Sequence, residues 1–220
     1  MRPRALFFDL DDTLIDRAGA FERYLDDLRA RHPDVFPRER RAEDLARLHT
    51  LDGRGYTDRT HFCRQVTLAY PALPLGVEAL WEDFAQRLPG FIQPQPGILA
   101  LVQGLKARWP VAVVSNGSSR MQRAKLARAG LSETLSDVFL SGEVGASKPD
   151  PRLFTAALAH VGHPPAEVLH VGDDPMRDIA GAAGVGMATC WISGGRDWPE
   201  GLPPPTFTLN HAEELLQVLK

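Results

Sequence analysis

The first feature of the chain is a short apolar run, residues 5–8, that ends in the acidic residues Asp9, Asp11 and Asp12. A strand that is apolar on both faces is typical of the middle of a parallel sheet. In open α/β sheets, ligands bind beyond the carboxyl ends of such strands. Aspartates are also common in ordinary strand-to-loop turns. The run therefore predicts a central strand, with Asp9 and Asp11 on one side of the chain above a possible site.

The next stretch, from about residue 17 to residue 88, follows a helical pattern. Two apolar stripes have the i, i+3, i+4, i+7 spacing of an amphipathic helix, and weaker helical patterns lie near residues 40–49 and 60–70. No convincing strand pattern interrupts them. We expect a small all-helical module of about four helices, each with one apolar face to bury. The two clear stripes consist of Phe21, Tyr24, Leu25 and Leu28, and of Val77, Leu80, Trp81 and Phe84.

Strand and helix patterns alternate after the turn signal Pro96-Gly97. Such alternation predicts a parallel sheet with right-handed crossovers, and hence a doubly wound α/β core whose first strand is followed by the helical insertion. The predicted strands are residues 111–115, 138–140, 168–171, 187–192 and 206–209, and the predicted helices lie near residues 98–105, 119–129, 154–161, 177–183 and 211–219.

Composition narrows the possible partners. The chain has 220 residues, 44% hydrophobic and 24% charged, with a formal net charge of -3. These values are ordinary for a globular protein and argue against a nucleic-acid or anionic membrane surface. No apolar run is long enough to span a membrane, and the first one is too short for a signal peptide. Cys63 and Cys190 have no metal-ligand spacing. We expect a cytoplasmic protein, and the sequence does not indicate its oligomeric state.

Polar residues lie next to three further predicted elements. Ser115-Asn116-Gly117 ends one strand, Gly172-Asp173-Asp174 ends another with Asp178 close behind, and Lys148 precedes a predicted helix. Each group alone has a simpler explanation as a turn, a helix cap or a solvated charge. Four such groups at one edge of a single sheet indicate a functional site instead.

The four groups together resemble the motifs of the haloacid dehalogenase-like (HAD) hydrolase superfamily, in the family's order. The resemblance covers essentially the whole chain and implies a Rossmann-like core. Only the gap between Asp9 and Ser115 is long enough for an extra module. By resemblance, this module is a helical cap inserted after the first motif. It would comprise residues 16–94, and the catalytic core would comprise residues 1–15 and 95–220.

The resemblance also implies roles for the acidic residues. Asp9 would be the nucleophile that forms an aspartyl-phosphate. Asp11 would be the general acid for the leaving alcohol and then the base for the attacking water. Mg²⁺ would bind Asp9, Asp173 and the backbone carbonyl of Asp11, and Asp174 and Asp178 would orient these ligands from outside.

Other motif residues would hold the phosphoryl group. By resemblance, Ser115 and Lys148 bind its oxygens, and Lys148 also restrains the charge of Asp9. Backbone N–H groups near Asn116 and Gly117 are expected to be further donors. This arrangement suits a metaphosphate-like transition state, for which catalysis is mainly positioning and charge stabilisation.

Asp11 narrows the reaction. Dehalogenases of the superfamily lack an acid at the matching position, so its presence favours phosphomonoester hydrolysis. Phosphotransferases, including sugar-phosphate mutases, keep both aspartates and remain an alternative, although they commonly have glycine where this chain has Asp12. A non-catalytic binding protein is the alternative from another class, because a fold alone does not determine function.

Substrate identity is the least determined feature. We expect a small phosphorylated metabolite, such as a sugar phosphate or nucleotide. Candidate contacts to its leaving group are Arg54, Tyr56, Arg59 and His61, which surround two glycines in the helical stretch. The alternative is that they are solvated loop and capping residues. His170, inside a predicted strand, is expected to be a packed core histidine.

Overall fold

The computed structural model describes residues 2–219, which form two compact units. The sheet unit combines the chain up to Asp16 with the chain from Gln93 onward. The helical unit is Arg17–Ile92.

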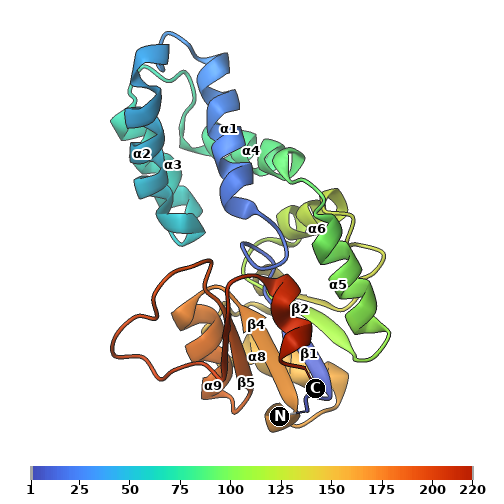
Figure 1. Cartoon of the computed structure of the whole chain (residues 1–220). Helices are drawn as coiled ribbons and strands as arrows, with labels where there is room; N and C mark the ends of the chain where they lie inside the picture. The colour runs from blue at the N-terminus through green and yellow to red at the C-terminus, as the bar shows by residue number, and fades with distance from the viewer. Residues whose placement is uncertain (1, 220) are drawn as a thin grey trace. The chain divides into compact units, whose positions relative to one another are not determined.

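The sheet unit contains one six-stranded sheet in which every pairing is parallel. The strand order is β3-β2-β1-β4-β5-β6. Figure 1 labels β1, β2, β4 and β5 of this sheet. This order is that of a doubly wound fold and confirms the predicted Rossmann-like α/β class. The strands are β1 (Ala5–Phe8), β2 (Val111–Ser115), β3 (Val138–Leu140), β4 (Val168–Gly172), β5 (Ala188–Ile192) and β6 (Phe207–Leu209).

Strand β1 lies between β2 and β4 because its side chains are apolar on both faces. All four of its residues are fully buried. Its Phe7 pairs with Ala112 of β2 and with His170 of β4. From β1, the sheet is built outward in both directions, through β2 and β3 on one side and through β4, β5 and β6 on the other. Doubly wound folds bind their ligands at this switch point in the strand order. The residues that follow β1, β2 and β4 therefore meet at one edge of the sheet.

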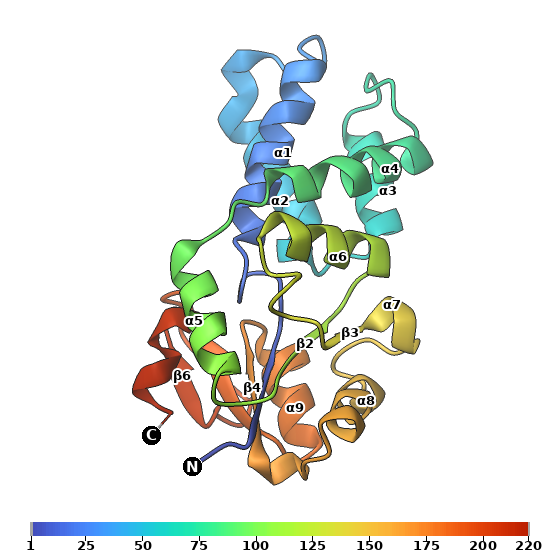
Figure 2. The same cartoon turned by 90° about the vertical axis from the view of Figure 1, so that its right-hand side faces the viewer.

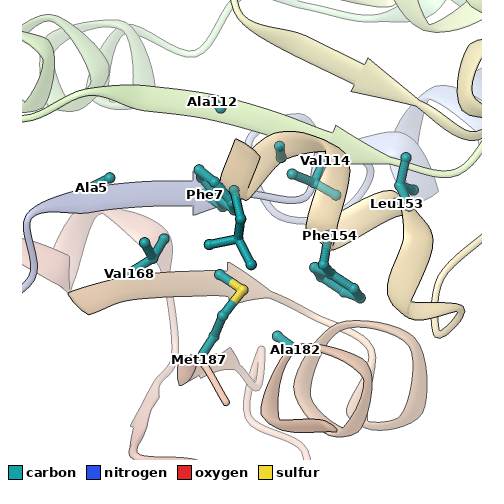
Figure 3. Packing of buried hydrophobic residues seen from close by; sticks show 11 residues of the cluster. Ala5, Phe7, Ala112, Val114, Leu153, Phe154, Val168, Ala182 and Met187 are labelled. Atoms are coloured by element: carbon teal, nitrogen blue, oxygen red, sulfur yellow. The ribbon is translucent and has the colours of Figure 1, made fainter. Parts of the chain in front are cut away.

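Helices cover both faces of this sheet. Figure 2 shows α5 on one side of the strands, with α8 and α9 on the other. On the α8 side, Ala5 and Phe7 of β1 share a buried cluster with Leu153 and Phe154 (Figure 3). The helices of the unit are α5 (Pro96–Lys106), α6 (Ser119–Arg128), α7 (Ser141–Val144), α8 (Pro151–Val161) and α9 (Gly181–Gly184), with short turns η4 (Pro165–Glu167), η5 (Pro175–Ala180) and η6 (Ala212–Gln217).

Two predicted helices have a different geometry. The helix expected at residues 177–183 begins at Pro175 as the π-helical turn η5 and continues as α9. Asp174 causes the early start, because its carboxylate accepts the N–H groups of Met176 and Arg177. The helix expected at residues 211–219 is instead the 3₁₀ turn η6.

The helical unit contains α1 (Arg17–Arg31), α2 (Arg41–Asp52), α3 (Arg59–Ala69) and α4 (Val77–Arg87), as its apolar stripes predict. Phe21 of α1 packs edge-on against Phe62 of α3 and Phe84 of α4. Short 3₁₀ turns complete the unit: η1 (Arg38–Arg40), η2 (Gly53–Gly55) and η3 (Leu88–Phe91).

Across residues 2–219, none of the helices combines the length and the hydropathy that crossing a membrane requires.

Candidate active site

Asp9 and Asp11 are held in a tight turn directly after β1. The Asp9 N–H donates to the Val171 carbonyl of β4 (2.9 Å), which fixes Asp9 against the neighbouring strand. The Leu10 carbonyl then accepts the N–H groups of Leu14 (3.0 Å) and Ile15 (3.1 Å). The turn is short enough that Asp12 adopts a left-handed φ of 56°. The chain therefore places two carboxylates at the sheet edge before it leaves the core.

Lys148 links Asp9 to Asp178. Its Nζ lies 2.6 Å from Asp9 Oδ1 and 2.6 Å from Asp178 Oδ1, and the lysine is 4% exposed. Burial opposes the lysine charge, but the two carboxylates prevail and raise the pKa of Lys148. Asn116 fixes the lysine from the end of β2: its Oδ1 accepts the Lys148 N–H (2.8 Å), and its Nδ2 donates to the Lys148 carbonyl (3.1 Å).

Three buried carboxylates meet beside this lysine. Asp9, Asp173 and Asp178 each offer one oxygen, and these oxygens lie within 4.8 Å of one another. Burial raises the pKa of Asp173 to about 8, and repulsion from Asp178 and Asp9 adds to the effect. Burial and the neighbouring acids also raise the pKa of Asp9, against the opposing charge of Lys148. The charges of Lys148, and of Arg196 beside Asp173, do not balance the three carboxylates. Hard oxygen ligands in this state fit a divalent cation such as Mg²⁺.

Asp178 differs from its two neighbours. Burial opposes its ionisation, but Lys148 and His170 prevail and lower the pKa of Asp178. Its second oxygen accepts the Asp174 N–H at 3.0 Å. Gly172 makes this position possible, because a Cβ there would collide with the Asp178 carboxyl group. Asp174 itself caps η5 and so sets the direction in which Asp178 projects.

Ser115 and Gly117 lie at the end of β2. Ser115 is 1% exposed, and its hydroxyl accepts a hydrogen bond from Gln122 Nε2 at 2.9 Å. The Gly117 N–H donates to the Ser141 hydroxyl at 2.9 Å. The parallel sheet therefore brings Ser115 to the same edge as Asp9, while the predicted phosphate donor Gly117 has a protein partner in this structure.

Several site neighbours carried no motif signal. Arg196 follows β5, and its Nη2 donates to Asp173 Oδ2 (3.2 Å) and to the Asp173 carbonyl (3.0 Å). Trp191 Nε1 donates to the same carbonyl (2.9 Å). His170 is buried as expected, but it also lies beside the site, with Nε2 3.0 Å from Asp178 Oδ1. Burial lowers the pKa of His170 and favours its neutral form.

The family model of the haloacid dehalogenase-like hydrolases matches residues 3–186. This chain belongs to the haloacid dehalogenase-like hydrolases. The matched range contains Asp9, Ser115, Lys148 and Asp173, and excludes Arg196.

Individual members of the family align over different shares of the chain. Pyrimidine 5'-nucleotidase YjjG of Escherichia coli (strain K12) is 35% identical over 140 residues, which are 63% of this chain and 62% of that protein. The chain thus spans less than two thirds of YjjG. The 5-amino-6-(5-phospho-D-ribitylamino)uracil phosphatase YigB of the same organism is 30% identical over 207 residues, which are 87% of this chain and 84% of YigB.

A solved structure shares the whole fold. The putative HAD-hydrolase YfnB of Bacillus subtilis, in a crystal form bound to magnesium, has a TM-score of 0.85 to this chain at 23% identity. The match covers 100% of both chains. At this identity the similarity shows a common fold and nothing finer.

In this haloacid dehalogenase-like hydrolase, the four candidate substrate contacts surround the η2 turn of the helical unit. Arg54, Tyr56 and His61 are exposed. Arg59 has partners in its own unit: Nη1 lies 2.7 Å from Asp52 Oδ1, and Nη2 donates to the Gly55 carbonyl at 2.5 Å. The contacts of Arg59 indicate that it holds the turn which presents Arg54 and Tyr56.

Proposed function

We propose that the protein is a Mg²⁺-dependent phosphomonoester hydrolase that acts on a small organic phosphate. The observation that carries the proposal is the contact between Lys148 and Asp9, 2.6 Å, at the edge where Ser115 and Asp173 also lie. The family membership supports this reading. The names of the relatives YjjG and YigB, a nucleotidase and a phosphatase, support a phosphorylated metabolite as substrate.

In the first step, a carboxylate oxygen of Asp9 attacks phosphorus and forms an aspartyl-phosphate. The bond from phosphorus to the ester oxygen breaks, and the leaving alcohol takes a proton from Asp11. In the second step, water attacks the same phosphorus and gives a proton to Asp11, while the bond from phosphorus to the Asp9 oxygen breaks. Inorganic phosphate leaves and Asp9 is regenerated, so one carboxyl group serves both proton transfers.

Ser115 and Lys148 would bind the phosphoryl oxygens. The ammonium group of Lys148 is already fixed between Asp9 and Asp178, so little reorganisation is needed when the substrate phosphate arrives. Asp178 Oδ1 holds the same ammonium group at 2.6 Å. Asn116, whose side chain bonds the Lys148 backbone at both polar groups, sets the distance between β2 and the lysine.

The metal would be held by Asp9, Asp173 and the backbone carbonyl of Asp11, with Asp178 close enough to orient them or to contribute an oxygen. When bound, Mg²⁺ supplies positive charge for Asp9 and the phosphoryl oxygens together. The raised pKa values of Asp9 and Asp173 support this assignment, because burial and the neighbouring acids disfavour their charged forms despite Lys148 and Arg196.

We further propose that residues 16–94 act as a cap that excludes water during turnover and contacts the leaving group. Arg54, Tyr56 and His61, with Arg59 in support, would make that contact. An arginine would bind an anionic group, and a tyrosine would stack on a sugar or base.

The test is hydrolysis of para-nitrophenyl phosphate with and without Mg²⁺, followed by a panel of sugar phosphates and nucleotides. We expect metal-dependent release of phosphate that falls at least about a thousandfold in Asp9→Asn, because the nucleophile is lost. Asp34→Asn makes the same chemical change at an exposed position and should keep the wild-type rate. Silence across the whole panel would contradict the proposal, and appearance of the phosphate on an added sugar would indicate a phosphotransferase.

A further inference from the structure

Two polar side chains of helix α6 lie buried beside the Asp11 carboxyl group. Gln122 is 1% exposed and Lys125 is 4% exposed. They are three residues apart and so project from the same face of the helix. Lysine is almost never this deeply buried without a partner, because the charge loses its hydration. Both residues lie outside the four motifs that define the site.

The contacts of this pair converge on Asp11. Lys125 Nζ lies 2.7 Å from both Oδ1 and Oδ2 of Asp11. Gln122 Nε2 donates to Asp11 Oδ2 at 3.0 Å and also to Ser115 Oγ at 2.9 Å. One amide group therefore joins the residue expected to exchange a proton to the residue expected to bind phosphate. The Asp11 carboxylate is held at both oxygens and cannot rotate without breaking charge-assisted hydrogen bonds.

The loop before α6 is shaped to let Gln122 reach this position. Gly117 has a φ of 140°, and a Cβ added to it would lie 2.9 Å from Cγ and Cδ of Gln122. Any larger residue would push the glutamine side chain away from Asp11. Ser118 then caps the helix by accepting the Met121 N–H (3.4 Å), which fixes where α6 begins. The glycine after Asn116 is therefore required by the packing of Gln122.

We propose that Gln122 and Lys125 are positioning residues that hold the Asp11 carboxyl group in register with Ser115. The effect on turnover rests on the proposed function, whereas the effect on the position of Asp11 does not. Asp11 remains the group that exchanges the proton, and the α6 pair sets where its carboxyl group lies. Correct placement of the Asp11 carboxyl group should raise the rate strongly, since a displacement of about 1 Å can lower a rate by about a hundredfold.

A double-mutant cycle tests whether Lys125 acts through Asp11. Lys125→Met should lower kcat by about 10-fold to 100-fold with KM changed less than about threefold, because substrate binding is untouched. Lys125→Arg should restore most of kcat, because it keeps the charge and the donors. In an Asp11→Asn background, Lys125→Met should have no further effect. An equal loss in both backgrounds, or a rise in KM at constant kcat, would overturn the positioning role.

The matched control is Arg123→Met on the same helix. Arg123 is an exposed cation paired with Glu143, so its removal should leave kcat within about twofold. A loss there comparable to that of Lys125→Met would attribute the effect to damage of α6 as a whole.

Crystal structures of Lys125→Met and Gln122→Met provide a readout that needs no turnover. We expect the Asp11 carboxyl group to leave its position, while Lys148 Nζ stays near its 2.6 Å contact with Asp9. If Asp11 keeps its position in both variants, the proposal is wrong whether or not the protein hydrolyses phosphomonoesters. A displaced Asp11 in a protein that hydrolyses none would refute only the proposed function.

Discussion

Asp52 in the helical unit and Asp9 in the sheet unit are both deeply buried carboxylates, but their surroundings shift their pKa values in opposite directions. Asp52 is paired with two arginines: Arg17 contacts both of its oxygens, at 2.6 Å and 2.7 Å, and Arg59 adds a third bond at 2.7 Å. Burial opposes the charge of Asp52, but the arginines prevail and lower its pKa. Asp9 shares one lysine with Asp178 and lies close to Asp173, and its pKa is raised.

Asp52 is a structural acid, whereas Asp9 belongs to the candidate site. Asp52 has more positive than negative charge around it, so it stabilises the η2 turn, whose Gly55 N–H it also accepts at 2.7 Å. The Asp9 cluster has too little positive charge around it, so its ionised form opposes folding and fits the proposed cation. Uncompensated buried charge at the strand ends, rather than burial of acids as such, marks the candidate site.

The largest expected effect on stability is from the structural acid. Asp52→Asn removes the negative charge that Arg17 and Arg59 both contact, and we expect the free energy of unfolding to fall by about 3–5 kcal/mol. Urea unfolding measured by circular dichroism gives this value, with Asp34→Asn as the exposed control. If the loss stays below about 1 kcal/mol, Asp52 is not the support that the comparison assigns to it.

Mg²⁺ should stabilise the folded protein through the Asp9 cluster and not through Asp52. Mg²⁺ at a hundredfold excess over its Kd should stabilise the protein by about 2.7 kcal/mol, because only the folded chain assembles Asp9 and Asp173. Thermal unfolding with a Mg²⁺ titration measures the gain. Asp173→Asn should abolish the rise in Tm with Mg²⁺. Asp52→Asn should lower the Tm without metal but leave the rise with Mg²⁺ unchanged. An unchanged response in Asp173→Asn would place the metal elsewhere.

Stability of the metal-free protein should fall as the pH rises. The pKa of Asp173 is raised to about 8 in the folded state from an ordinary value of 3.8. The folded state therefore keeps a proton that the unfolded state has released, and this contribution is lost as pH rises toward 8. Between pH 6 and 8 we expect a loss of about 1–2 kcal/mol, measured in chelator. Asp52, with its lowered pKa, acts oppositely and loses its contribution only in acid.

The smallest expected effect is the stability change from Asp9→Asn in chelator. Removing one charge from a repelling cluster relieves Asp173 but weakens the contact to Lys148. We expect the free energy of unfolding to rise by about 1 kcal/mol, opposite in sign to Asp52→Asn. Parallel urea titrations of Asp9→Asn and Asp52→Asn measure the two free energies of unfolding. A decrease in both variants would contradict the distinction between the two acids.

How much of the site could be predicted depends on how each residue reaches it. Asp9, Ser115 and Asp173 lie at the ends of strands, and parallel strands bring their carboxyl ends to one edge, so short runs that are apolar on both faces were enough to group them. Lys148 was grouped with them from its place before a predicted helix, but its contact with Asp9 came only from the resemblance, because nothing local shows that a loop lysine turns inward. The geometry of the helix predicted at residues 177–183 depended on the cap Asp174, which the apolar pattern does not show. At residues 211–219 no described side chain caps the 3₁₀ turn η6, and no local feature explains its geometry.

The sequence by itself determined the sheet, its insertion and the carboxylates at the strand ends, because these follow from local periodicity and from the rule that parallel strands share an edge. Only the tertiary structure decided which charges are paired. Lys125 and Asp11, or Arg17 and Asp52, are far apart along the chain, and nothing local distinguishes them from solvated residues. The burial of a charged group and its distance from opposite charges decide whether it stabilises the fold or forms part of a ligand site. Both are set only once the chain has folded.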